Sequence, residues 1–139
     1  MEILDKLKSM VGVGAPTLTL TALPGPVRSG QLLRSSVVLQ GGDYDAPVKD
    51  VQVRLEEERL AWPAPGRPER QFWRHLAEVV IGLDGRVLRQ GERLELSFEL
   101  VVPVDLVATG GAVGYALVAE TEVPGLNPRA ELVVTVEAG

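Results

Sequence analysis

The side chains that could perform catalysis are few. The chain has one histidine, His75, and no cysteine. A nucleophile needs a general base and an orienting group within hydrogen-bond reach, and no serine lies in a G-x-S-x-G turn. His75 alternates with Trp73 and Ala77. Phe72 and Leu76 lie on the opposite face of the predicted strand, so His75 is an ordinary strand histidine on the less buried face. The sequence therefore predicts a protein that is not an enzyme.

The carboxylates form two groups that lack the spacing of a metal site. Calcium takes about six to eight oxygen ligands, usually from a loop of defined spacing. Asp43, Asp45 and Asp50 supply only a fragment of such a loop, without its glycine and distal glutamate. The run of Glu56, Glu57 and Glu58 falls at the end of a predicted strand, where charges usually form a solvated face. We expect no metal ion and no cofactor.

Two further patterns could mark a ligand site. Gly12 and Gly14 have the glycine content of a phosphate loop, but such loops follow a strand and open a helix. Here the predicted helix comes first, so the glycines indicate its end. Arg67, Arg70 and Arg74 lie near aromatic residues and could stack on bases. The net charge of −5 gives no general attraction to phosphates, and the sequence predicts no nucleic acid partner.

The proline-rich stretch AWPAPGRPER, residues 61–70, is the exposed candidate for binding a protein. Prolines stiffen a loop, so little conformational entropy is lost when a partner binds. Trp62 could anchor the partner, because tryptophan is enriched at interface hot spots. Alternatively, Trp62 folds onto the edge of the domain and the prolines only block strand pairing. The candidate partner-binding residues of this predicted loop are Trp62, Pro63, Pro65 and Arg67.

Residues 2–11 predict a short amphipathic helix. Ile3, Leu7 and Met10 belong to one apolar stripe, with charged residues on the other side. A helix this short is not stable alone in water. The stripe must therefore pack against the protein's own domain, a partner groove or a membrane surface, and the few basic residues argue against a membrane. Ile3, Leu7 and Met10 are the second set of candidate partner-binding residues.

The remainder of the chain has the period-two alternation of β-strands. It is most regular from Arg93 to Val102, where every second residue is apolar. Asp84-Gly85 is a strong hairpin dipeptide. This pattern is typical of an all-β, immunoglobulin-like antiparallel sandwich. The predicted strands cover residues 17–23, 31–40, 48–58, 71–82, 92–102, 114–121 and 131–137.

The length of 139 residues fits a single domain with a substantial core. We assign residues 1–14 to the helix and its glycine stop, and residues 15–139 to one sandwich domain. No targeting segment is visible, and no window approaches the roughly 20 apolar residues that span a bilayer. We therefore expect a cytoplasmic protein with no integral membrane association.

Four passages carry a resemblance to a known group: VGVGAPTLTL, VRSGQLLRSSVVLQGGD, LELSFELVVPVDL and VAETEVPGLNPRAELVVTV. In order and spacing they resemble the N-terminal domain of the bacterial sporulation-control (SpoOM-type) family, which has an arrestin-like fold. Members of the family usually continue into a second sandwich domain. Near Arg129-Ala130-Glu131 they more often have acidic residues. The resemblance implies a non-enzymatic regulatory or scaffold role in the cytoplasm.

The leading hypothesis is therefore an arrestin-like module that acts by protein–protein binding. We expect it to associate with a second copy of itself as a twofold dimer. One alternative is a small-ligand carrier or enzyme, which would need a deep apolar pocket with convergent polar groups. Another is a structural subunit of a larger assembly, with the N-terminal helix packed on a neighbour.

Overall fold

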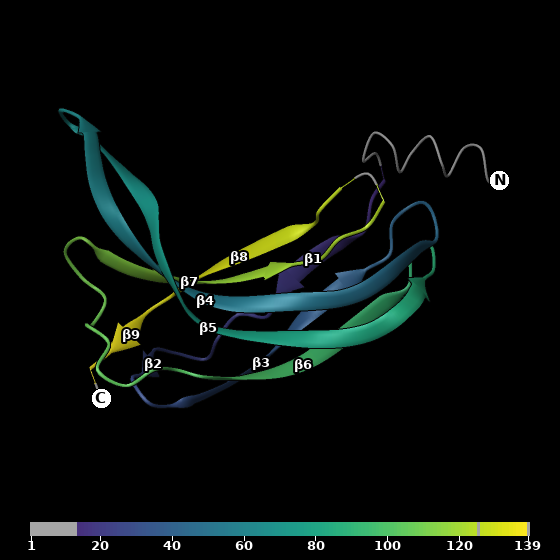
Figure 1. Cartoon of the computed structure of the whole chain (residues 1–139), viewed down its shortest axis with the longest axis horizontal. Coiled ribbons are helices and arrows are strands. Elements are labelled where there is room, and N and C mark those ends of the chain that lie inside the picture. Colours follow the sequence, from purple (N-terminus) through teal and green to yellow (C-terminus); the bar gives the residue numbers. More distant parts are fainter. Residues whose placement is uncertain (1–13, 125, 139) are drawn as a thin grey trace.

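The computed structural model describes residues 14–124 and 126–138, and these residues form β-strands and connecting loops (Figure 1). The strands are β1 (Thr17–Leu20), β2 (Val27–Arg28), β3 (Leu32–Gln40), β4 (Ala46–Ala64), β5 (Arg67–Leu88), β6 (Arg93–Val101), β7 (Val113–Glu120), β8 (Arg129–Val134) and β9 (Val136–Glu137). The predicted helix, with Ile3, Leu7 and Met10, lies outside the described residues.

Two antiparallel sheets form the body of the molecule. One has the strand order β1-β3-β6 and the other has the order β5-β4-β7-β8. The short strands β2 and β9, which the sequence did not predict separately, form a parallel pair. The prediction of an all-β sandwich is confirmed.

The core lies between the two sheets, where the alternating apolar residues meet. Val51, Val53 and Leu55 of β4 are fully buried. On β6, Phe98 and Leu100 are buried, whereas Glu99 between them is exposed. Each fully buried side chain of this size stabilises the fold by about 1.5–3 kcal/mol. The hydrophobic effect therefore fixes which face of each strand points inward.

Strands β4 and β5 are much longer than the sequence predicts, and together they form a projecting hairpin. Strand β4 pairs with β7 as far as Arg59, and beyond this point β4 and β5 continue alone. We call residues 59–73 the arm, which extends from the left end of the sandwich in Figure 1. The expectation that residues 62–68 form a loop is wrong, because the chain reverses only at Pro65 and Gly66, where Gly66 has a φ of 75°.

The predicted hairpin at Asp84-Gly85 is also wrong. Both residues have positive φ, 53° and 72° respectively, but β5 continues through them. The pairing of β5 with β4 shifts register between Val48 and Asp50. The two residues therefore form an irregularity within a strand, which a partner strand can absorb without reversing the chain.

Two further irregularities in β5 change which residues face the core. Trp73 and Leu76 have no partner on β4, so two residues of β5 are additional. As a result His75 lies opposite Glu56 and Ala77 opposite Leu55, although the simple alternation placed His75 and Ala77 on one face. The same alternation put Phe72, Leu76 and Val80 on one inward face, whereas the side chains of Phe72 and Val80 are more than half exposed.

Candidate functional site

The arm carries the most exposed aromatic side chains of the described residues. The relative exposures of Trp62, Phe72 and Trp73 are 64%, 55% and 59%. Trp62 therefore does not fold onto the edge of the sandwich. The guanidinium of Arg59 lies 5.2 Å from the ring centroid of Trp73, a cation–π distance.

The loop candidates of the sequence lie together at the end of the arm. Trp62 and Pro63 belong to β4, Pro65 lies in the turn, and Arg67 opens β5. Pro65 and Arg67 are exposed. The register shift between Ala61 and Ala64 leaves this part of the ribbon irregular, which suits prolines because they have no N–H to donate. The sequence did not predict that Phe72 and Trp73, which lie on β5 nearer the base of the arm, would also be exposed.

The base of the arm contains three consecutive buried glutamates. Glu56, Glu57 and Glu58 are only 5%, 1% and 9% exposed. The expectation that they form a solvated face is wrong. Strand β4 is flanked by β5 and β7 along this stretch, so its side chains lie between those of two neighbouring strands. Buried carboxylates must be paired or hydrogen-bonded to be tolerated.

Glu57 is the most completely paired of the three. Its Oε2 accepts a hydrogen bond from Nε of Arg59 at 2.7 Å, and its Oε1 accepts one from Nε of Arg74 at 3.1 Å. The terminal nitrogens of both arginines also lie within ion-pair distance of this carboxylate. Charge-assisted contacts of this kind are the strong hydrogen bonds of proteins. They join β4 to β5 where the arm leaves the sandwich.

Tyr115 of β7 lies opposite Glu57 and is also buried. Its hydroxyl donates a hydrogen bond to the carbonyl oxygen of Val107 at 2.5 Å. Burial, and then the negative charge of Glu57, raise the pKa of Tyr115 above its usual range. The phenol therefore stays protonated and acts as a structural donor.

Glu56 and Glu58 have weaker partners than Glu57. Glu56 accepts a hydrogen bond from Nε of Arg54 and lies 3.3 Å from Nε2 of His75. Glu58 lies 3.6 Å from Nη1 of Arg70, and its Oε2 has no hydrogen-bond partner among the described residues. Burial, and then the charge of Glu131, raise the pKa of Glu58. Glu58 is therefore the least stabilised carboxylate of the base.

The charges of the base are arranged in two layers. The glutamate side chains on β4 are at most 12% exposed, whereas Arg70, Arg74 and His75 on β5 are 53–58% exposed. Strand β5 is the edge of its sheet. The accessible layer is therefore basic and lies on the free edge, and the acidic layer lies beneath it.

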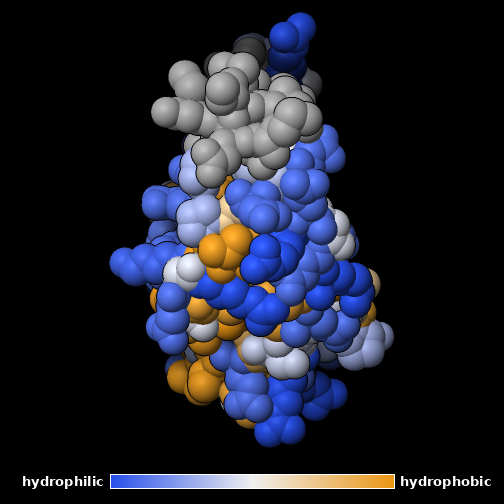
Figure 2. Space-filling view, turned by 90° about the vertical axis from the view of Figure 1, so that its right-hand side faces the viewer, coloured by the Kyte–Doolittle hydropathy of each residue, from blue (hydrophilic) through white to orange (hydrophobic). Residues whose placement is uncertain are grey.

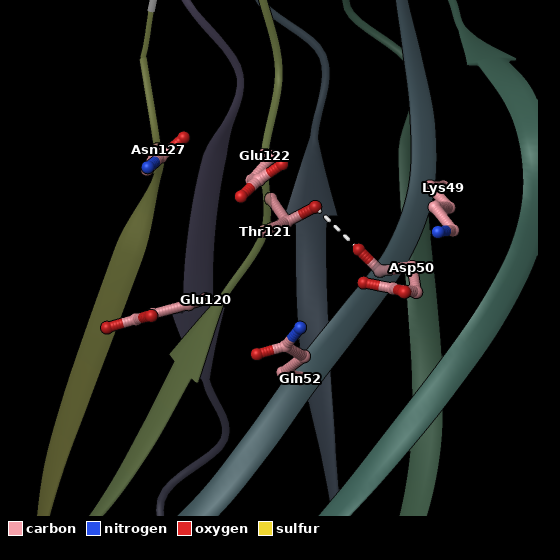
Figure 3. A pocket seen from close by; sticks show the side chains of 7 residues that line it. All are labelled: Lys49, Asp50, Gln52, Glu120, Thr121, Glu122 and Asn127. Atoms are coloured by element: carbon pink, nitrogen blue, oxygen red, sulfur yellow. Dashed lines mark hydrogen bonds between the residues drawn. The ribbon is translucent and has the colours of Figure 1, made fainter.

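A polar hollow of about 290 Å³ lies elsewhere on the same sheet (Figure 3). Its lining residues are Lys49, Asp50, Gln52, Glu120, Thr121, Glu122 and Asn127. The hydroxyl of Thr121 donates a hydrogen bond to the carbonyl oxygen of Asp50 at 2.6 Å. Across the described part of the chain, no three His, Cys, Asp or Glu side chains are placed to hold a metal ion.

The end of the molecule opposite the arm is mainly hydrophilic, with apolar residues scattered on it (Figure 2).

A larger, shallow groove of about 920 Å³ runs past β3, β5 and β6. Its lining includes Ser36, Ser97 and Glu99 together with Val80 and Phe98. The groove is open to solvent along its length. The described residues contain no helix with the length and apolar character of a transmembrane segment.

Comparison with solved structures identifies a protein with the same fold. The chain is similar over 91% of its length to the crystal structure of Spo0M, a sporulation control protein from Bacillus subtilis, with a TM-score of 0.76 and 17% identity. It covers 51% of that chain. A weaker similarity, with a TM-score of 0.48 and 12% identity, relates it to AvmM, described as catalysing macrocyclization in alchivemycin A biosynthesis, and covers 91% of this chain and 90% of that one.

No curated protein matches the sequence. The model of the SpoOM protein family matches residues 4–125, which is most of the chain. The resemblance in the four sequence passages is thereby confirmed, and the chain belongs to the SpoOM protein family.

Proposed function

We propose that this protein is a non-enzymatic regulatory or scaffold module that binds other proteins through the arm. The observation that carries the proposal is the exposure of Trp62, Phe72 and Trp73 on one projecting ribbon. Exposed aromatic groups gathered in one place are unusual on a soluble surface and mark interaction sites.

The ion pairs at the base of the arm support the same function. The contact of Glu57 with Arg74 joins the two strands of the arm at the base, and Arg59 of β4 binds the same carboxylate. A docking surface that is already ordered loses little conformational entropy when the partner binds. The ion pairs of the base thus hold the two strands of the arm together before a partner binds.

We further propose that the protein acts in the cytoplasm and forms a twofold dimer. Strand β8 is an edge of the four-stranded sheet among the described residues, and an edge offers unpaired N–H and C=O groups to a second chain. Sedimentation equilibrium tests this proposal, because a strict monomer at high micromolar concentration would contradict it.

The binding role is tested by quantitative affinity capture from an extract of the native host. Bait proteins would be the wild type, Trp62→Ser with Trp73→Ser, and the matched control Val104→Ser, since Val104 is 70% exposed outside the arm. We expect the same set of proteins with the wild type and the control, and its loss with the arm variant. Equal capture by all three folded baits would refute the role of the arm.

A further inference from the structure

We propose that the arm binds an extended acidic polypeptide segment along the free edge of β5, between Arg67 and His75. This inference rests on the proposed protein-binding function and names the chemistry of the partner. Four observations support the inference. They are the depth at which the charged side chains lie, the excess of arginines, the way arginine binds carboxylates, and the contrast with the acidic polar hollow.

The first argument is the depth of the charges. The side chains of Glu57 and Glu58, counted without their backbone, are 2% and 12% exposed, whereas those of their partners Arg74 and Arg70 are 58% and 54% exposed. A partner approaching from solvent meets the guanidinium groups first. Because Coulomb energy falls with distance, the nearer positive layer outweighs the deeper negative layer at contact.

The second argument is the number of groups. The arm, residues 59–73, contains three arginines, Arg59, Arg67 and Arg70, and one glutamate, Glu69. The arm therefore keeps a positive excess in a chain whose net charge is −5. The excess lies where the aromatic side chains are.

The third argument is the type of group. Arginine binds carboxylates through two parallel N–H···O bonds, and its planar head also stacks on aromatic rings. Arg59 already lies over Trp73. Phe72 and Trp73 can accept apolar side chains between the acidic ones. An extended segment presents its side chains alternately, so one face can carry the carboxylates and the backbone can pair with the edge of β5.

The polar hollow would not compete for such a segment. It is lined by Asp50, Glu120 and Glu122, with Lys49 as the single basic residue of its lining. Carboxylates of a partner would be repelled there. This contrast favours the arm over the hollow as the place where an acidic segment binds.

The test uses synthetic peptides as probes and the amide NMR spectrum of the full chain as the readout. One short peptide alternates glutamate with leucine, and in two matched peptides glutamine or lysine replaces every glutamate. Vesicles of phosphatidylcholine with phosphatidylserine form a separate arm of the experiment. The protein variants are Arg67→Gln and the control Arg34→Gln, whose side chain is 72% exposed outside the arm.

We expect the glutamate peptide to shift the amides of residues 67–75 and to bind at least about tenfold more tightly than the glutamine peptide. Arg67→Gln should weaken binding about threefold or more, and Arg34→Gln should leave it unchanged. Equal binding of the glutamine peptide would overturn the acidic chemistry while leaving a protein-binding arm. Shifts elsewhere, no binding, or the same amide shifts with vesicles only would also overturn the inference. The capture experiment decides the proposed function separately.

Discussion

The sandwich body and the base of the arm bury the same strand, β4, with different chemistry. In the body, Val53 and Leu55 are buried among aliphatic side chains. Two and three residues after Leu55, the buried side chains are Glu57 and Glu58. Apolar burial stabilises without regard to direction, whereas the carboxylates are tolerated only because arginines reach them from β5 and from β4 itself.

This difference teaches where stability and specificity lie. A buried ion pair gains little net free energy, because desolvation of the charges offsets their attraction. The pairs at the base therefore contribute mainly a defined geometry for the arm. Five substitutions, ordered by expected effect, can break or sharpen this comparison.

The largest effect is expected in the body. Leu117 of β7 is fully buried, and Leu117→Ala should lower the free energy of unfolding by about 3 kcal/mol, because a cavity remains. Thermal unfolding followed by circular dichroism should show a Tm lower by about 10 °C. The exposed control Val104→Ala should lie within about 0.5 kcal/mol of the wild type. A shift as small as that of the control would mean that Leu117 is not a core residue.

A smaller loss in the free energy of unfolding is expected at the base of the arm. Glu57→Gln leaves Arg59 and Arg74 without their carboxylate, and should cost about 2 kcal/mol because both arginines are partly exposed and can be hydrated. Hydrogen exchange of amides 59–73 should accelerate more than that of the body. The control is Glu95→Gln, at a surface pair. Unchanged hydrogen exchange in the arm would show that the ion pairs of Glu57 do not hold the arm in place.

A gain in thermal stability is expected when Glu58 is replaced, and this gain should depend on pH. Its raised pKa means that the folded state binds the proton more tightly than the unfolded state. The cost of its charge is therefore present above the folded pKa and is relieved as pH falls toward the ordinary glutamate range. Glu58→Gln should raise Tm at pH 7 by about 3 °C, and the difference should disappear in acid. A constant difference at all pH values, or one shared by the exposed control Glu99→Gln, would contradict the assignment.

The smallest effect is expected at the end of the arm. Trp62→Ser should change the free energy of unfolding by less than about 0.5 kcal/mol, since this side chain is exposed. Trp73→Ser should cost about 0.5–1 kcal/mol, because it also removes the contact with Arg59. Urea unfolding of both variants checks the order. The reverse order would show that Trp62 packs on the protein.

The fold was predictable because alternation reports burial directly. The faces of β3, β4 and β6 in the body follow from the positions of their apolar residues, and residues such as Leu33 and Val53 are buried as expected. The ends of β4 and β5 were not predictable from prolines and charges, which usually signal loops. The burial of Glu57 depends on arginines from two strands, a pairing that alternation along one strand does not reveal.

The exposed aromatics were missed for a related reason. Phe72 was placed with Leu76 on the more buried face by simple alternation, and the additional residues Trp73 and Leu76 break that alternation. Only the partner strand shows where an additional residue falls. Trp62 was found because proline and tryptophan stand out by composition rather than by position.

The additional residues of β5 have a consequence for how this family can vary in length. An edge strand with one free side can accommodate an inserted residue as a local bulge, as β5 does at Trp73 and Leu76. Strand β4 is paired on both sides as far as Arg59, and one insertion there would turn every following side chain to the opposite face. Single-residue insertions and deletions among relatives should therefore accumulate in β5 and avoid β4.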